Sequence, residues 1–341
     1  MTAPRELLLV GGSGFVGREL ARRLVSEGRL VRALARRPEV ARQVLPSQVR
    51  VIGGDLLEPE TLGPAVEGVD AIYYLAHSMA PSGTAEGFES RDRRAAQNLV
   101  GAATAAGVPR ILYVGGLGDE SPMRSPHLDS RREVAQLLAR GGPKLTALRA
   151  AIVVGAGGSS FEMVVQLVER LPVLLCPSWI RTRCQPIDVR DLVAYLAGCL
   201  DTPETSGRSF DVGGSEVLPY FDLLGRIGAR LGRRSRVVVL PVLTPGLSAH
   251  WVGLITDVPS SVARGLVEGM RTEVVCRENA IRSLVPIPLH SLDSALDAAL
   301  AHRPLRPLAL RQLGARVLGT RSETRAVFDL ARMRRVSESR T

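Results

Sequence analysis

A glycine-rich turn near the start of the chain limits the possible folds more than any other feature. The apolar run Glu6–Val10 is followed at once by Gly11, Gly14 and Gly17 in the pattern G-x-x-G-x-x-G, and a helix is predicted over residues 14–27. Glycine lets a backbone bend sharply and approach a pyrophosphate, while free N–H groups at a helix start face its negative charge. The strand–turn–helix order therefore predicts a dinucleotide-binding site.

Strand and helix signals alternate through the first half of the chain. Repeated βα units with short glycine-bearing turns indicate an α/β fold, a Rossmann-type doubly wound parallel sheet. Beyond residue 154 the alternation loosens. Strands are predicted at 6–10, 30–35, 49–52, 71–75, 110–114, 145–149, 210–212 and 237–240, a strand or a loop at 173–177, and helices at 14–27, 60–66, 88–106, 130–140, 160–170, 187–200, 220–231 and 260–270.

Three parts of the chain are predicted to have different roles. Residues 1–155 would form the dinucleotide-binding Rossmann core, and residues 156–300 a small C-terminal substrate-binding cap that packs on the core and returns some chain to the sheet. Residues 301–341 would form a basic C-terminal tail. Open α/β sheets bind ligands at the carboxyl ends of their strands, so the cleft is expected there.

The net charge of +10 is concentrated in that tail. Residues 301–341 carry ten arginines and three acids, whereas the other 300 residues carry 34 basic and 31 acidic side chains. Aromatic residues do not interleave with these arginines as in a nucleic-acid site, so no nucleic-acid partner is expected. The leucine spacing within the tail leaves contact with a protein or an anionic membrane as an alternative to a solvated appendage.

Location and metal content are predicted from two absences in the sequence. The N-terminus lacks the pattern of a signal peptide, so a cytoplasmic location is expected. The four cysteines are widely and irregularly spaced without a CxxC motif, which favours reduced thiols over a metal site or disulfides.

The uncharged stretch 237–256 contains Pro241, Pro245 and Gly246, so it is predicted to be a buried loop and lid helix rather than a membrane element.

The end of the second predicted strand favours NADP over NAD. NAD-binding proteins tend to carry an acid there for the ribose 2′-hydroxyl, but this chain has Arg36 and Arg37. Two guanidinium groups would pair with a 2′-phosphate, although both could be ordinary surface charge in an arginine-rich chain. After the third strand, Asp55 and Leu56 are placed to touch adenine; the alternative for Asp55 is a cap on the next helix.

Six further motifs accompany the glycine turn. They are AIYYLAHSM at 71–79, DRRAAQN at 92–98, HLDSR at 127–131, LRAAIVVG at 148–155, QPIDVRDL at 185–192 and WVGLIT at 251–256. Through them, residues 5–300 resemble the atypical extended short-chain dehydrogenase/reductases, specifically the NmrA-like and YbjT-like group. The resemblance implies a Rossmann core, a substrate region and a cleft between them. It implies cofactor contacts from Gly11, Ser13, Gly14, Phe15, Val16, Gly17, Arg36, Arg37, Asp55, Leu56, Leu75, Ala76, His77, Ser78, Asn98, Arg131 and Ala151.

This chain departs from the superfamily in its catalytic residues. Active members use a Ser or Thr, a Tyr-x-x-x-Lys pair and often an Asn, but none of the five tyrosines here has a lysine four residues on. His127 and Arg131 stand at the corresponding place, the serine position reads Gly115-Gly116, and Asn98 remains.

Two functional interpretations therefore stay open. In one, the protein is a reductase in which His127 donates the proton and Arg131 holds the ribose; His77 is a second candidate donor. The substrate would be a small, apolar quinone or carbonyl compound. Its expected contacts are Ser159, Ser160, Phe161, Trp179, Arg183 and Trp251. In the other, the chain is catalytically silent and senses NADP(H) or serves as an assembly or regulatory protein, and each histidine is an ordinary loop residue.

Overall fold

The computed structural model describes residues 6–77, 87–118, 126–171, 173–233, 236–240 and 270–303. Several predicted features lie outside these ranges: Ser78, Trp251, residues 260–269 of a predicted helix and the tail beyond residue 303. The side chains of His127 and Trp179 are likewise outside the description, although their backbones are within it.

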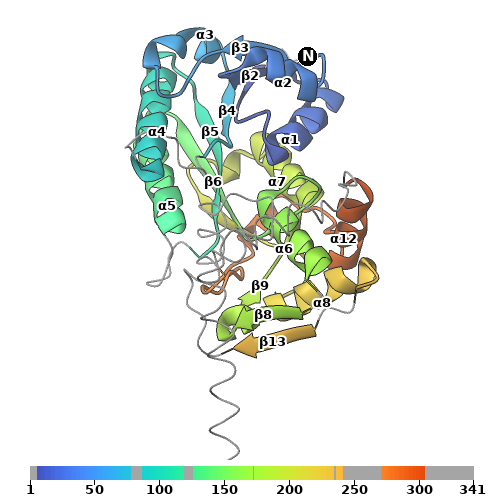
Figure 1. The fold of residues 1–341 in the computed structure, drawn as a ribbon. Helices are drawn as coiled ribbons and strands as arrows, with labels where there is room; N and C mark the ends of the chain where they lie inside the picture. The colour runs from blue at the N-terminus through green and yellow to red at the C-terminus, as the bar shows by residue number, and fades with distance from the viewer. Residues whose placement is uncertain are drawn as a thin grey trace, which may run out of the picture.

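The predicted α/β architecture is confirmed by a seven-stranded, fully parallel sheet (Figure 1). Its strand order is β11-β6-β5-β4-β1-β2-β3, so the winding direction reverses between β1 and β4. Ligands of open α/β sheets bind beside such a reversal, at the carboxyl ends of the strands. The strands are β1 (Glu6–Val10), β2 (Leu30–Ala35), β3 (Arg50–Gly53), β4 (Ala71–Tyr74), β5 (Arg110–Gly116), β6 (Lys144–Ala150) and β11 (Ser209–Val212).

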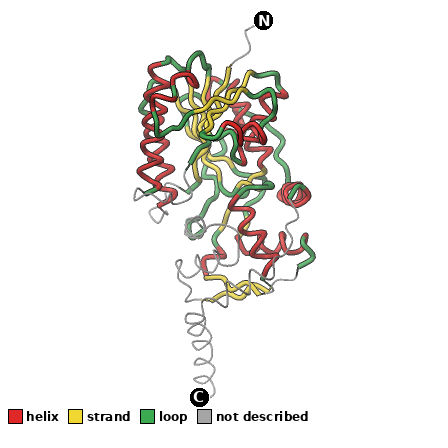
Figure 2. The backbone as a smooth tube through the Cα atoms, turned by 45° about the horizontal axis from the view of Figure 1, so that its top comes forward, coloured by secondary structure: helices red, strands yellow, loops and turns green. Residues whose placement is uncertain are grey.

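Both faces of the sheet are covered because successive side chains of a strand point to opposite faces. In β1, Leu7 and Leu9 join one apolar cluster, and Leu8 and Val10 join another. The first cluster includes residues of α1 (Phe15–Ser26), α2 (Pro38–Val44) and α7 (Val189–Asp201). The second includes residues of α3 (Gly63–Val66), α4 (Phe88–Ala105) and α5 (Pro126–Ala139), and Figure 2 shows the strands between these helices.

A third apolar cluster forms the core of the part of the chain that lies beyond the carboxyl edge of the sheet. It involves α6 (Ser159–Arg170), α8 (Tyr220–Arg230) and α12 (Leu292–Ala301), which lie below the sheet in Figure 1. Three two-stranded sheets pair β7 with β10, β9 with β12 and β8 with β13. Their strands, with the remaining helices, are β7 (Val153–Val154), β8 (Val173–Pro177), β9 (Arg183–Cys184), β10 (Ile187–Asp188), β12 (Leu218–Pro219), β13 (Arg236–Leu240), α11 (Ala280–Leu284) and the 3-10 turns η1 (Pro59–Thr61), η2 (Ser178–Arg181) and η3 (Pro203–Thr205).

Some elements differ from the sequence prediction for local reasons. The helix expected at 60–66 is split into η1 and α3, and Pro64 accounts for this because it has no N–H to continue a helical ladder. Helix α5 begins at Pro126, four residues earlier than expected, where the fixed φ of proline suits a first helical position. Helix α2 was not predicted; it buries only Ala41, so it leaves little apolar periodicity.

Within the described ranges, no helix combines the length and apolar character needed to cross a bilayer.

Candidate cofactor and substrate site

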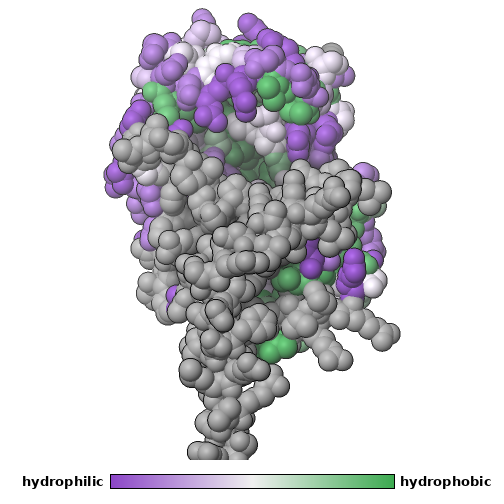
Figure 3. All heavy atoms as spheres, in the orientation of Figure 1, coloured by the Kyte–Doolittle hydropathy of each residue, from purple (hydrophilic) through white to green (hydrophobic). Residues whose placement is uncertain are grey.

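A pocket of about 920 Å³ lies where the carboxyl ends of the strands face helix α6. Figure 3 shows a hollow below the rim of the upper part of the molecule. The glycine turn, the ends of β2, β4, β5 and β6, the loop after β3 and the start of α6 all line it. Predicted cofactor residues that line it are Gly11, Ser13, Gly14, Phe15, Val16, Gly17, Arg36, Arg37, Asp55, Leu56, Leu75, Ala76, His77, Arg131 and Ala151.

The three glycines of the turn are constrained in different ways. Gly11 has φ +87°, and a Cβ there would lie 2.7 Å from the Ala76 nitrogen. A Cβ on Gly17 would lie 2.4 Å from the Gly11 carbonyl oxygen, so α1 packs directly on the turn. Gly14 differs, because its Cβ would meet only that same oxygen within 4 Å, at 3.2 Å. The backbone at Gly14 therefore leaves open space on the pocket side, as the approach of a pyrophosphate requires.

Two arginines stand at one end of the pocket. Arg36 and Arg37 follow β2, are exposed and line the pocket. Among the described residues, neither guanidinium has an ion-pair or hydrogen-bond partner. Arg32, within β2 itself, differs because it pairs with Glu6. Two cations without partners at a pocket rim suit a phosphate.

The loop after β3 is held by its own hydrogen bonds. The Leu57 N–H donates to Asp55 Oδ1 at 3.0 Å, and the Asp55 N–H donates to Thr61 Oγ1 at 3.0 Å. Asp55 therefore closes a turn, and the alternative of a helix cap is wrong, since neither η1 nor α3 has a side-chain cap. Asn98 does not line the pocket: its Nδ2 donates to the Leu56 carbonyl at 2.8 Å, so it reaches the site through that loop.

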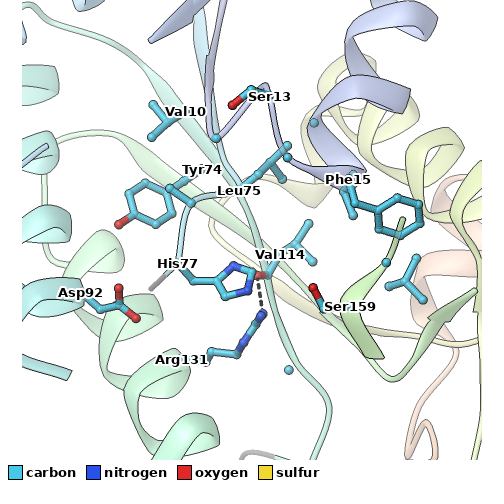
Figure 4. A pocket seen from close by; sticks show the side chains of 18 of the residues that line it. Val10, Ser13, Phe15, Tyr74, Leu75, His77, Asp92, Val114, Arg131 and Ser159 are labelled. Atoms are coloured by element: carbon cyan, nitrogen blue, oxygen red, sulfur yellow. Dashed lines mark hydrogen bonds between the residues drawn. The ribbon is translucent and has the colours of Figure 1, made fainter. Parts of the chain in front are cut away.

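At the other end, His77, Arg131 and Ser159 point into the same space (Figure 4). Arg131 Nη1 donates to the Val114 carbonyl at 3.3 Å, and the Tyr113 hydroxyl donates to the Arg131 carbonyl at 3.1 Å. The start of α5 is thereby tied to the end of β5. His127 falls in the first turn of α5, one turn before Arg131.

The position of the missing serine is crowded, so a side chain there would require neighbouring side chains to shift. A Cβ on Gly116 would lie 2.6 Å from Leu128 Cδ2, and one on Gly115 would lie 3.1 Å from the Tyr113 ring. Both glycines line the pocket at the end of β5. A serine at either glycine would therefore require Leu128 of α5 or the Tyr113 ring to move.

Asp92 is a pocket residue that sequence reasoning missed as a site residue. It comes from α4, is 6% exposed and accepts a hydrogen bond from the Ser130 hydroxyl at 3.3 Å. Burial, and to a smaller extent the charge of Asp92, raise the pKa of the neighbouring Tyr74 far above its usual value, so that phenol stays protonated. An acid within the apolar pattern of α4 was the available signal.

The predicted substrate residues separate into two groups. Ser159 and Ser160 line the pocket. Phe161 does not: it is 1% exposed inside the third apolar cluster. Arg183 is exposed away from the pocket, with its Nη2 2.9 Å from Glu273 Oε1. The pocket wall on this side is largely apolar and was not predicted; it comprises Leu117, Ile152, Met163, Val164, Tyr220, Met270 and Val274.

No group of three or more His, Cys, Asp or Glu side chains is arranged to hold a metal ion in the part of the chain that the structure describes.

Comparison with known proteins agrees with this geometry. Residues 11–152 match the NAD(P)H-binding family. A ceramide reductase of Caulobacter vibrioides is 27% identical over 260 residues, which cover 75% of this chain and 81% of the reductase. The photosystem II assembly factor Ycf39 of Trieres chinensis is 24% identical, over 69% of this chain and 72% of that protein.

A solved structure shares the fold at low sequence identity. The NADPH-dependent quinone oxidoreductase QOR2 of Escherichia coli, complexed with NADPH, superposes with a TM-score of 0.67 at 17% identity, covering 85% of this chain and 98% of QOR2. The predicted resemblance agrees with these findings: residues 11–152 match the NAD(P)H-binding family model, and the chain shares its fold with solved structures that include a short-chain dehydrogenase/reductase superfamily protein from Agrobacterium tumefaciens, with a TM-score of 0.63 at 19% identity, covering 87% of this chain and 97% of that chain.

Proposed function

We propose that this protein is an NADP(H)-dependent reductase of small, apolar quinone or carbonyl compounds that works without the Ser-Tyr-Lys triad. One observation carries the proposal: a single pocket joins the glycine turn and two partnerless arginines to a polar end at His77 and Arg131 and to an apolar wall. The reductases among the similar proteins, one of them complexed with NADPH, support it.

The residues of the pocket suit the parts of NADP(H). The glycine turn would take the pyrophosphate, Arg36 and Arg37 the 2′-phosphate, and the loop at Asp55 and Leu56 the adenine. Arg131 would hold the nicotinamide ribose, and the strand ends at Leu75, Ala76 and Ala151 would flank the cofactor. When bound, NADPH supplies a hydride.

The proton would come from a histidine. Arg131 cannot serve, because a guanidinium stays protonated. Tyr74 lines the pocket, but its raised pKa and a hydroxyl that points away from His77 and Arg131 in Figure 4 make it a poor donor. His127, one helical turn before Arg131, and His77, at the end of β4, remain as the candidates.

A second candidate function is a catalytically silent NADP(H)-sensing or assembly protein. The observation that favours it is the absence of any Tyr-x-x-x-Lys pair from the sequence, together with glycine at residues 115 and 116, where active members carry a serine or threonine. The similarity to Ycf39, an assembly factor, points the same way.

Turnover distinguishes the two functions. The full chain is incubated with NADPH and a panel of quinones, aldehydes and ketones, and the absorbance of the reduced cofactor is followed; NADPH binding is measured separately by calorimetry. A reductase consumes NADPH with at least one class of acceptor. Tight NADPH binding without turnover across the panel refutes the reductase and favours the silent protein.

A further inference from the structure

Tyr220 places a phenol on the apolar wall of the pocket. It is the first residue of α8, lines the pocket and is 3% exposed. Its backbone N–H donates to the Thr182 carbonyl at 3.1 Å, and no hydrogen bond joins its hydroxyl to another described residue. The hydroxyl is also not one of the buried side-chain atoms that lack a partner, so it is open to a group that enters the pocket.

The surroundings of Tyr220 contain little else that is polar. The neighbouring wall residues Leu117, Met163, Val164, Met270 and Val274 are apolar. The ionisable side chains of His77, Arg91, Asp92 and Arg131 line the sheet side of the pocket and come from the segment after β4, from α4 and from α5. Together with Ser159 and Ser160 at the start of α6, Tyr220 therefore supplies one of the few hydrogen-bonding side chains on this largely apolar side of the pocket.

The other tyrosines do not offer a comparable group. The Tyr73 hydroxyl donates to the Leu196 carbonyl at 3.2 Å and the Tyr113 hydroxyl to the Arg131 carbonyl at 3.1 Å. Tyr195 lies outside the pocket, and Tyr74 belongs to the sheet side. Burial raises the pKa of Tyr220 well above its usual value, with a smaller contribution from Cys184, so the phenol keeps its proton and can donate at neutral pH.

We propose that the Tyr220 hydroxyl donates a hydrogen bond to an oxygen of the substrate, and that the substrate is a mostly apolar molecule whose ring or chain packs on Leu117, Met163, Val164 and Val274. This inference rests on the proposed reductase function for its choice of a carbonyl or quinone oxygen. It adds a specificity-determining residue to the pocket: apolar contacts would supply affinity, and the phenol would select compounds with an accepting oxygen in one position.

The test compares two flat ligands that differ in oxygen. Menadione has two quinone carbonyls, and 2-methylnaphthalene has the same ring skeleton without them. Each is titrated by calorimetry into the full chain saturated with NADP+, so that no reduction takes place. Tyr220→Phe removes only the hydroxyl, and Tyr195→Phe is the matched control because it removes a buried hydroxyl outside the pocket.

Tyr220→Phe is expected to weaken menadione binding by roughly three- to tenfold and to leave 2-methylnaphthalene and NADP+ binding unchanged. Tyr195→Phe should change none of the three. Unchanged menadione affinity in Tyr220→Phe overturns the proposal, and so does an equal loss for both ligands, which would reduce Tyr220 to a packing residue. If the selective loss appears in a protein that never oxidises NADPH, the reductase function fails and the Tyr220 contact stands.

Discussion

The carbonyl oxygen of Gly11 would lie 2.4 Å from a Cβ atom on Gly17. No real side chain tolerates that distance to a backbone atom, so the first turn of α1 rests on the glycine turn only because residue 17 has no Cβ. Gly14, three residues earlier, faces open space on the pocket side. The two positions should therefore respond differently to substitution.

Gly14→Val is expected to abolish NADPH binding while the fold survives. The valine side chain would extend into the pocket where the pyrophosphate is expected, and its Cβ would meet only the Gly11 oxygen, at 3.2 Å. Calorimetry measures the NADPH affinity, and thermal denaturation shows whether the variant is folded. An NADPH affinity equal to the wild type in a folded Gly14→Val protein would place the pyrophosphate elsewhere.

Gly17→Ala is expected to destabilise the protein itself. One methyl group would force α1 away from the turn, at a cost of about 1–3 kcal/mol by analogy with overpacked cores. Denaturant unfolding measures this, with Gly101→Ala in α4 as the control, because a Cβ there meets nothing within 4 Å. Equal stabilities of the two variants would contradict the close contact.

Replacing Arg36 and Arg37 with alanine should remove most of a preference for NADPH over NADH. One charge-assisted contact to a phosphate is worth about 1.5–3 kcal/mol, so the double variant is expected to lose at least roughly ten- to a hundredfold in NADPH affinity. Arg42→Ala, an exposed arginine of α2 outside the pocket, is the control. Equal affinities for the two cofactors in the unmodified protein would refute the assignment.

Asn98→Ala should weaken NADPH and NADH alike, by roughly three- to tenfold. The amide is the donor to the Leu56 carbonyl, so its loss loosens the loop at the adenine end without removing a direct contact to the 2′-phosphate. Gln97→Ala, on the exposed side of the same helix, should have no effect. A selective loss for NADPH alone would show that Asn98 acts in some other way.

His127→Ala is expected to cut turnover by about 10²–10⁴ and to leave NADPH affinity within a few-fold. Arg131→Ala should lower both, because its guanidinium lines the pocket and would hold the ribose. The wild-type rate should fall as pH rises through the imidazole range, since the protonated ring is the donor. Full activity in His127→Ala would leave His77 as the candidate proton donor. Full activity in His127→Ala, in His77→Ala and in the double variant would exclude both histidines as donors.

The Glu6–Arg32 pair should make stability depend on pH. The hydrogen bond from Arg32 lowers the pKa of Glu6 in the folded protein, so the pair stabilises the fold above the ordinary glutamate pKa and loses that contribution as the pH falls through the lowered value. Glu6→Gln should thus be less stable than the wild type at pH 7, and the two should converge in acid. Denaturant midpoints across pH measure the difference; a gap that does not shrink in acid would contradict the pair.

Elements and site residues could be predicted from the sequence where their conformation is determined by neighbouring residues of the chain. Strands β1 and β2 were predicted to the residue, because mostly apolar runs, interrupted in β2 only by Arg32 and ended by glycine or arginine, mark strands buried on both faces. The pocket residues around the glycine turn followed from the same local chemistry. Helix α12 was missed although Ser291 caps it by accepting from the Ser294 N–H, since the preceding irregular chain gives no periodic signal.

Asp92 and Tyr220 show why other site residues could not be predicted. Each faces the pocket only because its helix packs against another that is distant in sequence: α4 on α5, and α8 on α6. Phe161 and Arg183 lie away from the pocket for the same reason, since the side of a helix or an ion pair determines which way each side chain points. Such choices depend on tertiary packing.

The return of the chain to the sheet has a consequence for synthesis on the ribosome. Strand β11 pairs with β6, and helix α7 covers α1, so the nucleotide-binding layer is completed only after residue 212 has been made. A nascent chain that ends before α7 would expose the open edge of β6 and the leucines of α1, both of which invite aggregation. Chaperone demand during translation should accordingly peak between the emergence of β6 and that of β11.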